Sequence, residues 1–525
     1  MECLNETAPG NSSSLILSSK FVHRIVIQIG DTSICSSDRP FLDREECTIT
    51  VNNSSCSFAL VKEGMNELVP LWTMIGLYFM IAAVVYTFVH FWGSYKYSGE
   101  PSPAPGEEED QKLESDGNAV TSTSAESGIR EEVNVSKKRI MSLDAFRGAT
   151  ILLMIFVNYG GGGCTWFHHR PWYGLTIADL VFPAFVLIMG FSIALSTRSR
   201  LTAKKDFLLL VCKVLRRSAK LFALGIILNT DYTNLSELRV PGVLQRFALS
   251  YLFVALFHVY SVYRANKYLS RPGQITSAQL VVIFAPEIAA HCSILLIYLY
   301  FTFWFNYASE CPKGYQGPGG LEEQGKFFNC TGGAANFLDR AIFGTDHIYK
   351  RPTSKEVYKH TLSHDPEGLL GLTTSILMTE LGLICGRVLI KVRSHYRRLI
   401  CWFILATCSG AVAALLTSTD LIPVVKNLWS LSFVCATAAI CISLFILFYT
   451  LIDTTRVWTN GTPFHYPGAN AILLYVGHVV LARYFPFYFQ VAPSHSQLLA
   501  QVSFACFLWL IISMYLFRKR IFWVL

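Results

Sequence analysis

The chain has 525 residues, of which 52% are hydrophobic and only 15% are charged, and its formal net charge is +8. A soluble protein of this length rarely carries so few charged residues, so the composition excludes an ordinary soluble enzyme. A helix needs about 20 apolar residues to cross a bilayer core of ~30 Å. Eleven stretches meet this length, near residues 68–92, 142–160, 175–196, 207–229, 241–262, 279–305, 368–390, 398–416, 429–450, 467–484 and 498–516. The sequence therefore predicts an all-α polytopic membrane protein with about 11 transmembrane helices.

The first predicted segment, residues 1–66, is a small luminal domain that we expect to be β-rich and truncated. It contains four cysteines and several N-glycosylation sequons: Cys3, Cys35, Cys47, Cys56, Asn5, Asn11, Asn52 and Asn53. Paired cysteines and glycosylation are typical of an oxidising, luminal compartment, although the connectivity stays open. The opening stretch MECLNETAPGNSSSLILSSK has neither the basic region nor the apolar core of a signal peptide. Either upstream residues are missing, which we expect, or the first span acts as a reverse signal anchor.

The rest of the chain is predicted to divide into three parts. Residues 67–93 form the first transmembrane helix. Residues 94–140 are acidic and rich in proline and serine, with almost no aromatic side chains, so they predict a disordered cytosolic linker. Residues 141–525 then form a block of ten transmembrane helices, with a luminal loop over residues 306–367.

Basic residues indicate the orientation, because cytoplasmic loops carry an excess of lysine and arginine. The basic clusters fall on one side of the predicted spans, near residues 137–139, 198–205, 264–271, 387–398 and 518–520. The other side carries Cys311, Cys330 and the sequon at Asn329. We therefore expect a luminal N-terminus and a cytosolic C-terminus.

A polar stretch, VNYGGGGCTWFHHRPWYGLTIADLVFP, joins two of the predicted spans. It contains Asn158, four consecutive glycines, His168 and His169, and it ends with Asp179 about one helical turn inside the following span. Glycine lets the backbone approach closely and leaves amides free to bind a ligand. A histidine in such a turn can simply contact lipid headgroups, whereas an aspartate inside a span is a functional hypothesis by default.

Basic side chains also lie inside the span near 207–229. Lys213, Arg217 and Lys220 share one face by i, i+4, i+7 spacing. They either extend toward anionic lipid headgroups or bind phosphate, with Arg147 of the SLDAFRG motif on the same side of the membrane.

Two further spans carry polar residues. Arg246, in RVPGVLQRF, lies about a turn and a half inside its span and needs a partner, for which Asp179 is one candidate. Asn470 and His478 are eight residues apart and are expected to share a helix face, where they bond to other helices or bind a ligand.

Motifs of soluble enzymes are missing from the sequence. There is no Walker A motif, no GxSxG and no zinc-type cysteine spacing, and no predicted strand precedes NYGGGG as a dinucleotide fingerprint requires. The residues alone leave two classes open, an enzyme and a transporter.

From about residue 140 to the C-terminus, the motifs resemble those of the heparan-α-glucosaminide N-acetyltransferase family. The resemblance rests on SLDAFRGATILLMIFVNYGGGG, GLTIADLVFPAFVLIMG, RVPGVLQR, CPKGYQGPGG, NCTGGAANFLDR, HDPEGLLG, KNLWSLSF and PGANAILLYVGH, which occur in the family's order. It implies a multi-pass enzyme of the lysosomal membrane that moves acetyl from cytosolic acetyl-CoA to the terminal non-reducing glucosamine of heparan sulfate in the lumen. A membrane acyltransferase of another sugar or sugar-lipid, or a transporter, is the alternative.

The resemblance also assigns roles. The family's active histidine corresponds to His169, with His168 as the alternative, and His169 acts as base or acetyl carrier. Asp179 would orient it, and Asn158 with the amides of residues 160–163 would stabilise an oxyanion. The residues assigned to acetyl-CoA are Arg147, Lys213, Arg217, Arg246, Asn470 and His478. A homodimer and contacts with membrane lipid are expected, with no metal and no nucleic acid.

Overall fold

The computed structural model describes four strands between residues 22 and 62, a few residues between 71 and 80, and residues 139–523 with gaps at 198–203, 230–234, 270–276, 361 and several positions within 483–493. The chain divides into two units. The first consists of Met1–Asn66 together with Met141–Leu525, and the second is Glu67–Ile140. Most of the second unit, which holds the predicted first transmembrane helix and the predicted linker, lies outside the described residues. The cysteine side chains expected to pair before residue 66 also lie outside them.

Residues 22–62 form two antiparallel hairpins. Strand β1 (Val22–Ile29) pairs with β2 (Thr32–Pro40), and β3 (Glu46–Asn52) pairs with β4 (Ser55–Lys62). Each hairpin has one register shift, between Ile27 and Gln28 in the first and between Glu46 and Cys47 in the second.

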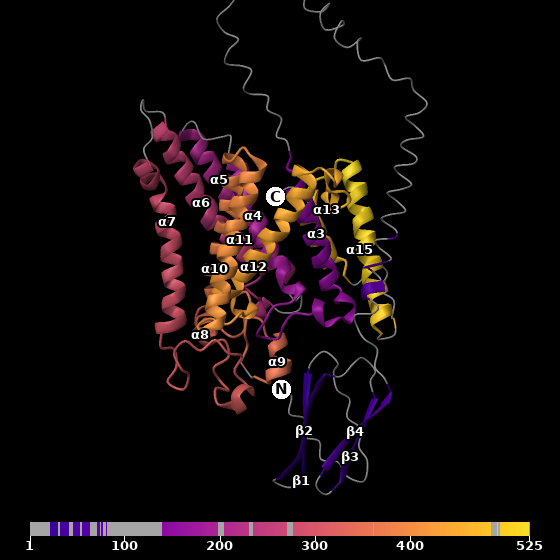
Figure 1. The fold of residues 1–525 in the computed structure, drawn as a ribbon. Coiled ribbons are helices and arrows are strands. Elements are labelled where there is room, and N and C mark those ends of the chain that lie inside the picture. The colour runs from indigo at the N-terminus through magenta and orange to yellow at the C-terminus, as the bar shows by residue number, and fades with distance from the viewer. Residues whose placement is uncertain are drawn as a thin grey trace, which may run out of the picture. The chain divides into compact units, whose positions relative to one another are not determined.

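Long apolar helices make up the rest of the described chain, and Figure 1 shows them running alongside one another. They are α3 (Met141–Asn158), α4 (Val181–Thr197), α5 (Lys204–Asn229), α6 (Val243–Leu269), α7 (Ser277–Leu299), α10 (Leu369–Lys391), α11 (His395–Ser418), α12 (Leu431–Tyr449) and α15 (His495–Arg518). The short helices are α8 (Gly333–Phe343), α9 (Thr353–Tyr358), α13 (His465–Ala469) and α14 (Ala471–Val480). Among the described residues, 8 helices are long and apolar enough to cross a membrane, which confirms an all-α polytopic membrane protein.

Three of the eleven predicted spans are not among these 8, and the first of them, near 68–92, lies mostly outside the described residues. Helix α5 matches the predicted span near 207–229 in length, but its charged residues keep it outside the apolar group. The predicted span near 467–484 is not one helix. Its backbone is interrupted at Asn470, where φ is −124°, so α13 and α14 are separate.

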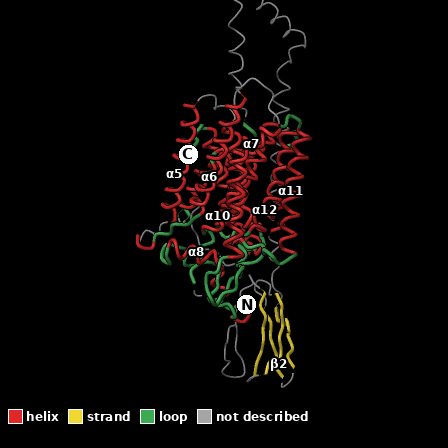
Figure 2. The backbone as a smooth tube through the Cα atoms, turned by 90° about the vertical axis from the view of Figure 1, so that its left-hand side faces the viewer, coloured by secondary structure: helices red, strands yellow, loops and turns green. Residues whose placement is uncertain are grey.

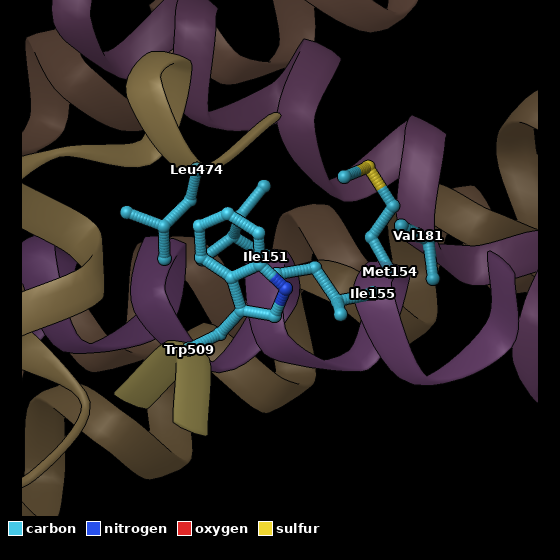
Figure 3. Close-up of a cluster of buried hydrophobic side chains, with 6 residues drawn as sticks. All are labelled: Ile151, Met154, Ile155, Val181, Leu474 and Trp509. Atoms are coloured by element: carbon cyan, nitrogen blue, oxygen red, sulfur yellow. The ribbon is translucent and has the colours of Figure 1, made fainter. Parts of the chain in front are cut away.

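The core of the bundle fixes the position of the connection between α3 and α4, which contains the glycine run, His169 and Asp179. Side chains from α3, α4, α14 and α15 form one buried cluster: Ile151, Met154, Ile155, Val181, Leu474 and Trp509 (Figure 3). Van der Waals packing holds these side chains together, because lipid tails are as apolar as the side chains themselves. Because Ile155 lies one turn before the end of α3 and Val181 begins α4, this cluster keeps the residues between them at one end of the bundle.

Small residues bring α4 and α10 into backbone contact. A Cβ at Gly190 would lie 2.1 Å from the carbonyl oxygen of Thr379, and one at Gly382 would lie 2.1 Å from that of Leu187. Close approach of this kind is the usual means by which membrane helices associate, since lipid removes the hydrophobic drive between them.

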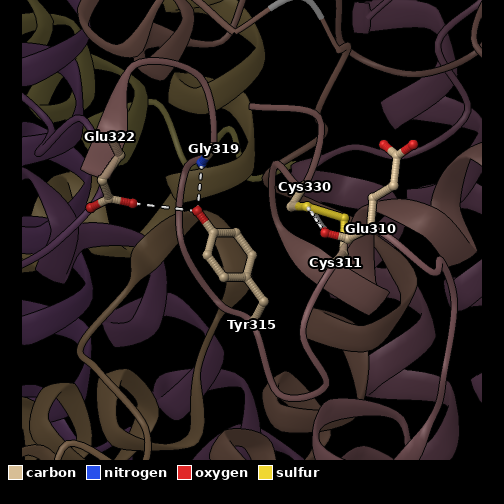
Figure 4. Close-up of a disulfide and its surroundings, with 6 residues drawn as sticks. All are labelled: Glu310, Cys311, Tyr315, Gly319, Glu322 and Cys330. Carbon is tan, nitrogen blue, oxygen red and sulfur yellow. Dashed lines mark hydrogen bonds between the residues drawn. A yellow bond between two sulfur atoms is a disulfide. The ribbon is translucent and has the colours of Figure 1, made fainter. Parts of the chain in front are cut away.

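Loops gather at the end of the bundle where α8 and α9 lie, which we call the loop end (Figures 1 and 2). Here Cys311 and Cys330 form a disulfide, as expected for this segment although the partners were left open (Figure 4). Nearby, the Gly319 amide donates to the Tyr315 hydroxyl, 3.1 Å away. We call the opposite end, where α13 and residues 519–523 lie, the tail end.

Candidate active site at the loop end

The glycine run forms a turn that other residues could not adopt. Gly160, Gly161, Gly162 and Gly163 all have positive φ, from 56° to 99°. The turn packs closely, because a Cβ at Gly162 would lie 2.8 Å from Leu499 of α15. The amides of Gly160 and Gly163 donate within the turn, to the carbonyls of Val157 and Gly160. Close packing therefore explains much of the glycine requirement, and two of the four predicted oxyanion donors are already engaged.

His169 and Asp179 form a hydrogen-bonded pair. The imidazole Nδ1 lies 2.7 Å from Asp179 Oδ1. A carboxylate only accepts, so Nδ1 carries the proton and Nε2 is the nitrogen available to a substrate. The His169 side chain is 40% exposed, whereas that of Asp179 is fully buried. A buried carboxylate thus orients an accessible imidazole.

The start of α4 fixes Asp179 locally. The 3-10 turn Ile177–Leu180 precedes α4, and Thr176 caps it. The Thr176 amide donates to Asp179 Oδ2 at 3.1 Å, and its hydroxyl lies 3.0 Å from the same oxygen. This reciprocal capping box holds the carboxylate in one rotamer and satisfies the oxygen that His169 does not use.

Lys426 provides the positive charge near Asp179. Its Nζ lies 3.4 Å from Asp179 Oδ1, and its side chain is mostly buried. Burial lowers the pKa of Lys426, while the neighbouring Asp179 carboxylate acts to raise it. A buried carboxylate next to an ammonium is neutralised, so His169 need not be protonated to compensate it.

Three loops far apart in sequence build this corner. Asn427 Nδ2 donates to the Pro171 carbonyl at 2.8 Å, and Trp172 Nε1 donates to the Gln316 carbonyl at 2.9 Å. His364 Nε2 lies 3.1 Å from the Asn427 carbonyl oxygen, and burial lowers the pKa of His364 to about 4. The histidine is therefore neutral and donates this hydrogen bond. Tertiary packing, not local sequence, brings Lys426 to Asp179.

Asn158 and His478 form a second polar pair at the end of α3. Asn158 Nδ2 lies 2.9 Å from His478 Nε2, and His478 Nδ1 lies 3.1 Å from the Leu474 carbonyl oxygen. The carbonyl must accept from Nδ1, so Nε2 accepts from Asn158, and His478 is a neutral, buried positioning residue. Asn158 itself is exposed and keeps one amide N–H for another acceptor.

Arg246 does not pair with Asp179. Its Nη2 donates to the carbonyls of Pro366 and Gly368, at 2.9 and 3.1 Å, and its guanidinium lies 4.9 Å from the centre of the Trp429 ring. Lys426 lies beside Asp179, in the position predicted for Arg246. The reason is that Arg246 is fully buried and directed toward the loop over residues 364–368.

Arg147 and Asn470 lie toward the tail end. Arg147 contacts Asp144 at 2.9 Å, Ser192 at 3.2 Å and the Gly468 carbonyl at 3.3 Å. Asn470 bonds backbone groups of the C-terminal tail, donating to the Ile521 carbonyl at 2.9 Å. Because the helix breaks at Asn470, this residue and His478 do not share a helix face, and that expectation is wrong.

The remaining predicted basic residues lie on α5, which begins at the tail end. Lys213 is exposed, and Arg217 is half-buried with its guanidinium 4.7 Å from the centre of the Tyr251 ring. The six residues assigned to acetyl-CoA do not lie together. Arg147, Asn470 and Lys213 lie toward the tail end, and Arg246 and His478 lie toward the loop end. Arg217 lies between them, because the hydroxyl of its neighbour Ser218 donates to the Ala248 carbonyl, two residues after Arg246 on α6.

Comparison with known proteins shows what the chain is similar to. Residues 139–302 match the family model for heparan-alpha-glucosaminide N-acetyltransferase, catalytic. The heparan-alpha-glucosaminide N-acetyltransferase of Homo sapiens is 39% identical over 397 residues, which cover 73% of this chain and 60% of the human protein. The chain is a relative of the heparan-alpha-glucosaminide N-acetyltransferases. The protein of that name from Mus musculus is 38% identical over 400 residues, covering 74% of this chain and 61% of the mouse protein.

These comparisons confirm the resemblance predicted from the motifs. The chain spans about three fifths of the length of these two acetyltransferases. The segment that matches the family model contains the glycine turn, His169 and Asp179. Lys426 lies beyond it and was missed as a site residue, although its place in KNLWSLSF, just before a predicted span, was a usable signal.

Proposed function

We propose that this chain transfers an acetyl group from acetyl-CoA to the amine of a terminal α-glucosamine of heparan sulfate. The printed name of its two relatives gives heparan-alpha-glucosaminide N-acetyltransferase activity for them. The observation that carries the proposal is the buried Asp179 that holds an accessible His169, in the same connection between α3 and α4 that begins at the exposed Asn158. Aminolysis of a thioester needs a base for the amine proton and donors for the oxyanion, and these residue types supply both.

The proposed chemistry uses His169 Nε2 as the base. The glucosamine nitrogen attacks the thioester carbonyl carbon, His169 accepts the proton that the amine loses, and the carbon–sulfur bond breaks to release CoA as a thiolate, which is then protonated. Asp179 stabilises the imidazolium while it exists, and the second N–H of Asn158 is the proposed oxyanion donor. A trapped acetyl group on His169 would instead indicate a covalent, ping-pong route.

The donor is proposed to enter from the tail end. Arg147 and Lys213 are basic groups toward that side, Arg217 lies one turn further along α5, and guanidinium and ammonium groups form charge-assisted hydrogen bonds with phosphate. We propose that the tail end is cytosolic and the loop end luminal in a lysosomal membrane. The disulfide at Cys311 and the exposed sequon at Asn329 support this orientation. A homodimer in contact with lipid, with residues 1–66 luminal and 94–140 cytosolic, completes the proposal.

The direct test is an assay of the purified chain in lipid vesicles. With labelled acetyl-CoA and a heparan-derived oligosaccharide that ends in glucosamine, we expect labelled N-acetylglucosamine termini. The same oligosaccharide with its terminal amine already acetylated is the control and should take up no label. Transfer to another sugar or to a lipid would overturn the substrate assignment. Label that crosses the vesicle membrane unchanged would indicate a transporter.

Replacing Lys426 with methionine should make the reaction more sensitive to acid. Asp179 then lacks its ammonium neighbour and favours the protonated imidazole of His169, which cannot act as a base. We expect activity to fall roughly tenfold at about pH 5.5 and much less at about pH 7.5, so the acid limb moves to higher pH. The measurement is initial rate against pH with saturating acetyl-CoA.

Two controls accompany this prediction. Lys313→Met removes an exposed lysine of the loop near Cys311 and should leave the pH profile unchanged. Lys426→Arg keeps the charge and should restore most of the profile. A folded Lys426→Met protein with the wild-type pH profile would show that Lys426 does not influence His169.

A further inference from the structure

A second group of ionisable side chains lies within the membrane-spanning helices, away from His169. It comprises His258 on α6, Glu287 and His291 on α7, and Glu380 and Arg387 on α10. Ionisable groups at this depth are costly and mark functional sites by default. None of these five residues has a part in the proposed acetyl transfer.

Arg387 connects the three helices and compensates one carboxylate. Its Nη2 forms an ion pair with Glu287 Oε1 and also lies 2.8 Å from His258 Nδ1. Its Nη1 lies 3.5 Å from Glu380 Oε1. Because arginine only donates, His258 accepts through Nδ1 and is neutral. Lys391, the next basic residue on α10, lies over the Phe284 ring at 5.4 Å. Two carboxylates thus face one arginine.

A single proton balances the second carboxylate. His291 Nδ1 lies 2.7 Å from the Glu287 carbonyl oxygen, which can only accept, so Nδ1 carries hydrogen. His291 Nε2 and Glu380 Oε2 are 3.3 Å apart. Neither atom has a hydrogen-bond partner. Two bare lone pairs would repel at this distance, so the two groups together hold one proton, on either the imidazole or the carboxyl. With that proton the cluster is neutral, and without it the cluster carries one net negative charge inside the membrane.

A cavity of about 500 Å³ opens beside this cluster. Its polar wall is Glu287, His291, Glu380 and Arg387, and its apolar wall is Phe284, Ile288, Cys292 and Ile384. Glu287 is 2% exposed, yet its Oε2 has no hydrogen-bond partner. A volume of this size is typical of small-molecule sites. The cavity therefore presents a buried acceptor that lacks a donor.

The cavity opens toward the outer surface of the bundle. Ile288 and Cys292 line it and are also exposed, Ile288 by 55%. Helix α7 lies at one side of the bundle in Figure 1, and much of its length is exposed apolar surface, for example at Leu296. A ligand with an apolar tail can lie along this surface while its head reaches the carboxylates.

We propose that this cavity binds the ammonium head of a long-chain amine, and that the amine replaces the proton shared by His291 and Glu380. An ammonium supplies several N–H donors, which Glu287 Oε2 and Glu380 can accept, and it restores neutrality when the proton leaves. An alcohol brings no charge, and an anionic head would lie against two carboxylates whose arginine is already paired. The apolar wall and the exposed face of α7 receive the tail.

The test uses the full chain in phosphatidylcholine nanodiscs and a dodecylamine that carries a diazirine close to its amine. Photolabelling should map by mass spectrometry to peptides containing Ile288 or Ile384, and the alcohol of equal length should label them far less. Because binding releases one proton, labelling at subsaturating amine should rise with pH, by up to about tenfold per unit. This readout is independent of acetyl transfer, so its failure would not bear on the proposed activity.

Substitutions sharpen the outcome. Glu287→Gln and Glu380→Gln should each reduce labelling by the amine at least about tenfold. Ile288→Trp fills the cavity without changing its charge and should also block labelling, which covers the case where a charge variant misfolds. Glu356→Gln, at an exposed acid on α9, is the matched control and should label as the wild type does.

Three results would overturn the proposal. Equal labelling by the amine and the alcohol would mean ordinary lipid contact. Labelling that is unchanged in the folded glutamate variants and in Ile288→Trp would place the amine elsewhere. Displacement of the probe by an ethanolamine phospholipid, but not by unlabelled dodecylamine, would mean that the cavity is a phospholipid headgroup site.

Discussion

Replacing His169 with alanine is expected to reduce acetyl transfer at least about 100-fold, since a positioned acid or base typically contributes 10²–10⁴. The protein should stay folded, because His169 is exposed and its removal opens no cavity in the core. The measurement is the initial rate with saturating acetyl-CoA and glucosaminide, together with gel filtration of the purified protein.

His168→Ala is the matched control, one residue away in the same turn. The Asp179 carboxylate bonds to His169, and from His168 the turn uses the backbone carbonyl, which lies 2.9 Å from the Thr176 hydroxyl. A change of the His168 side chain should therefore keep most of the activity. If the two phenotypes are exchanged, His168 is the active histidine, and the geometry around Asp179 serves another purpose.

Asp179→Asn should be nearly as damaging, with a loss of about 10²–10⁴ in rate. The carboxylate accepts from His169 on one oxygen and from the Thr176 amide on the other. Asparagine has only one accepting oxygen, and its other terminal group is a donating NH₂. If the NH₂ faces the Thr176 amide, two donors oppose each other. If it faces His169, it favours the tautomer in which Nδ1 lacks hydrogen. The rate should fall with little change in the KM for acetyl-CoA.

A double variant that also replaces the buried Lys426 separates the effect of Asp179 on stability from its effect on activity. Asp179→Asn alone leaves an uncompensated ammonium, which costs stability. Adding Lys426→Met removes that charge, so the double variant should melt at a higher temperature than Asp179→Asn while remaining as inactive. Recovery of activity in the double variant would show that Asp179 is a structural ion-pair partner and not the residue that orients His169.

The order and nature of the helices followed from the sequence, because hydrocarbon solvent imposes a simple rule. A backbone that crosses a bilayer must satisfy its own hydrogen bonds, so about 20 apolar residues form a helix whatever surrounds them. The pairing of His169 with Asp179 was also predictable. The two residues are ten apart, and the turn between them is too short to carry them to different ends of the bundle.

The sequence did not determine which basic residue lies beside the buried Asp179 carboxylate. Arg246 was the predicted candidate partner of Asp179, and Lys426 was not among the predicted site residues. Only the packing of the loops near Pro171, Gln316 and Asn427 decided between them. The cluster around Arg387 is a similar case, since its members come from three helices and no local pattern relates them. Long-range contacts cost chain entropy and depend on the complete fold, whereas helix formation in a membrane is a local property. The sequence by itself therefore determined the helices and the pairing of His169 with Asp179, and the tertiary structure decided the electrostatic surroundings in which that pair lies.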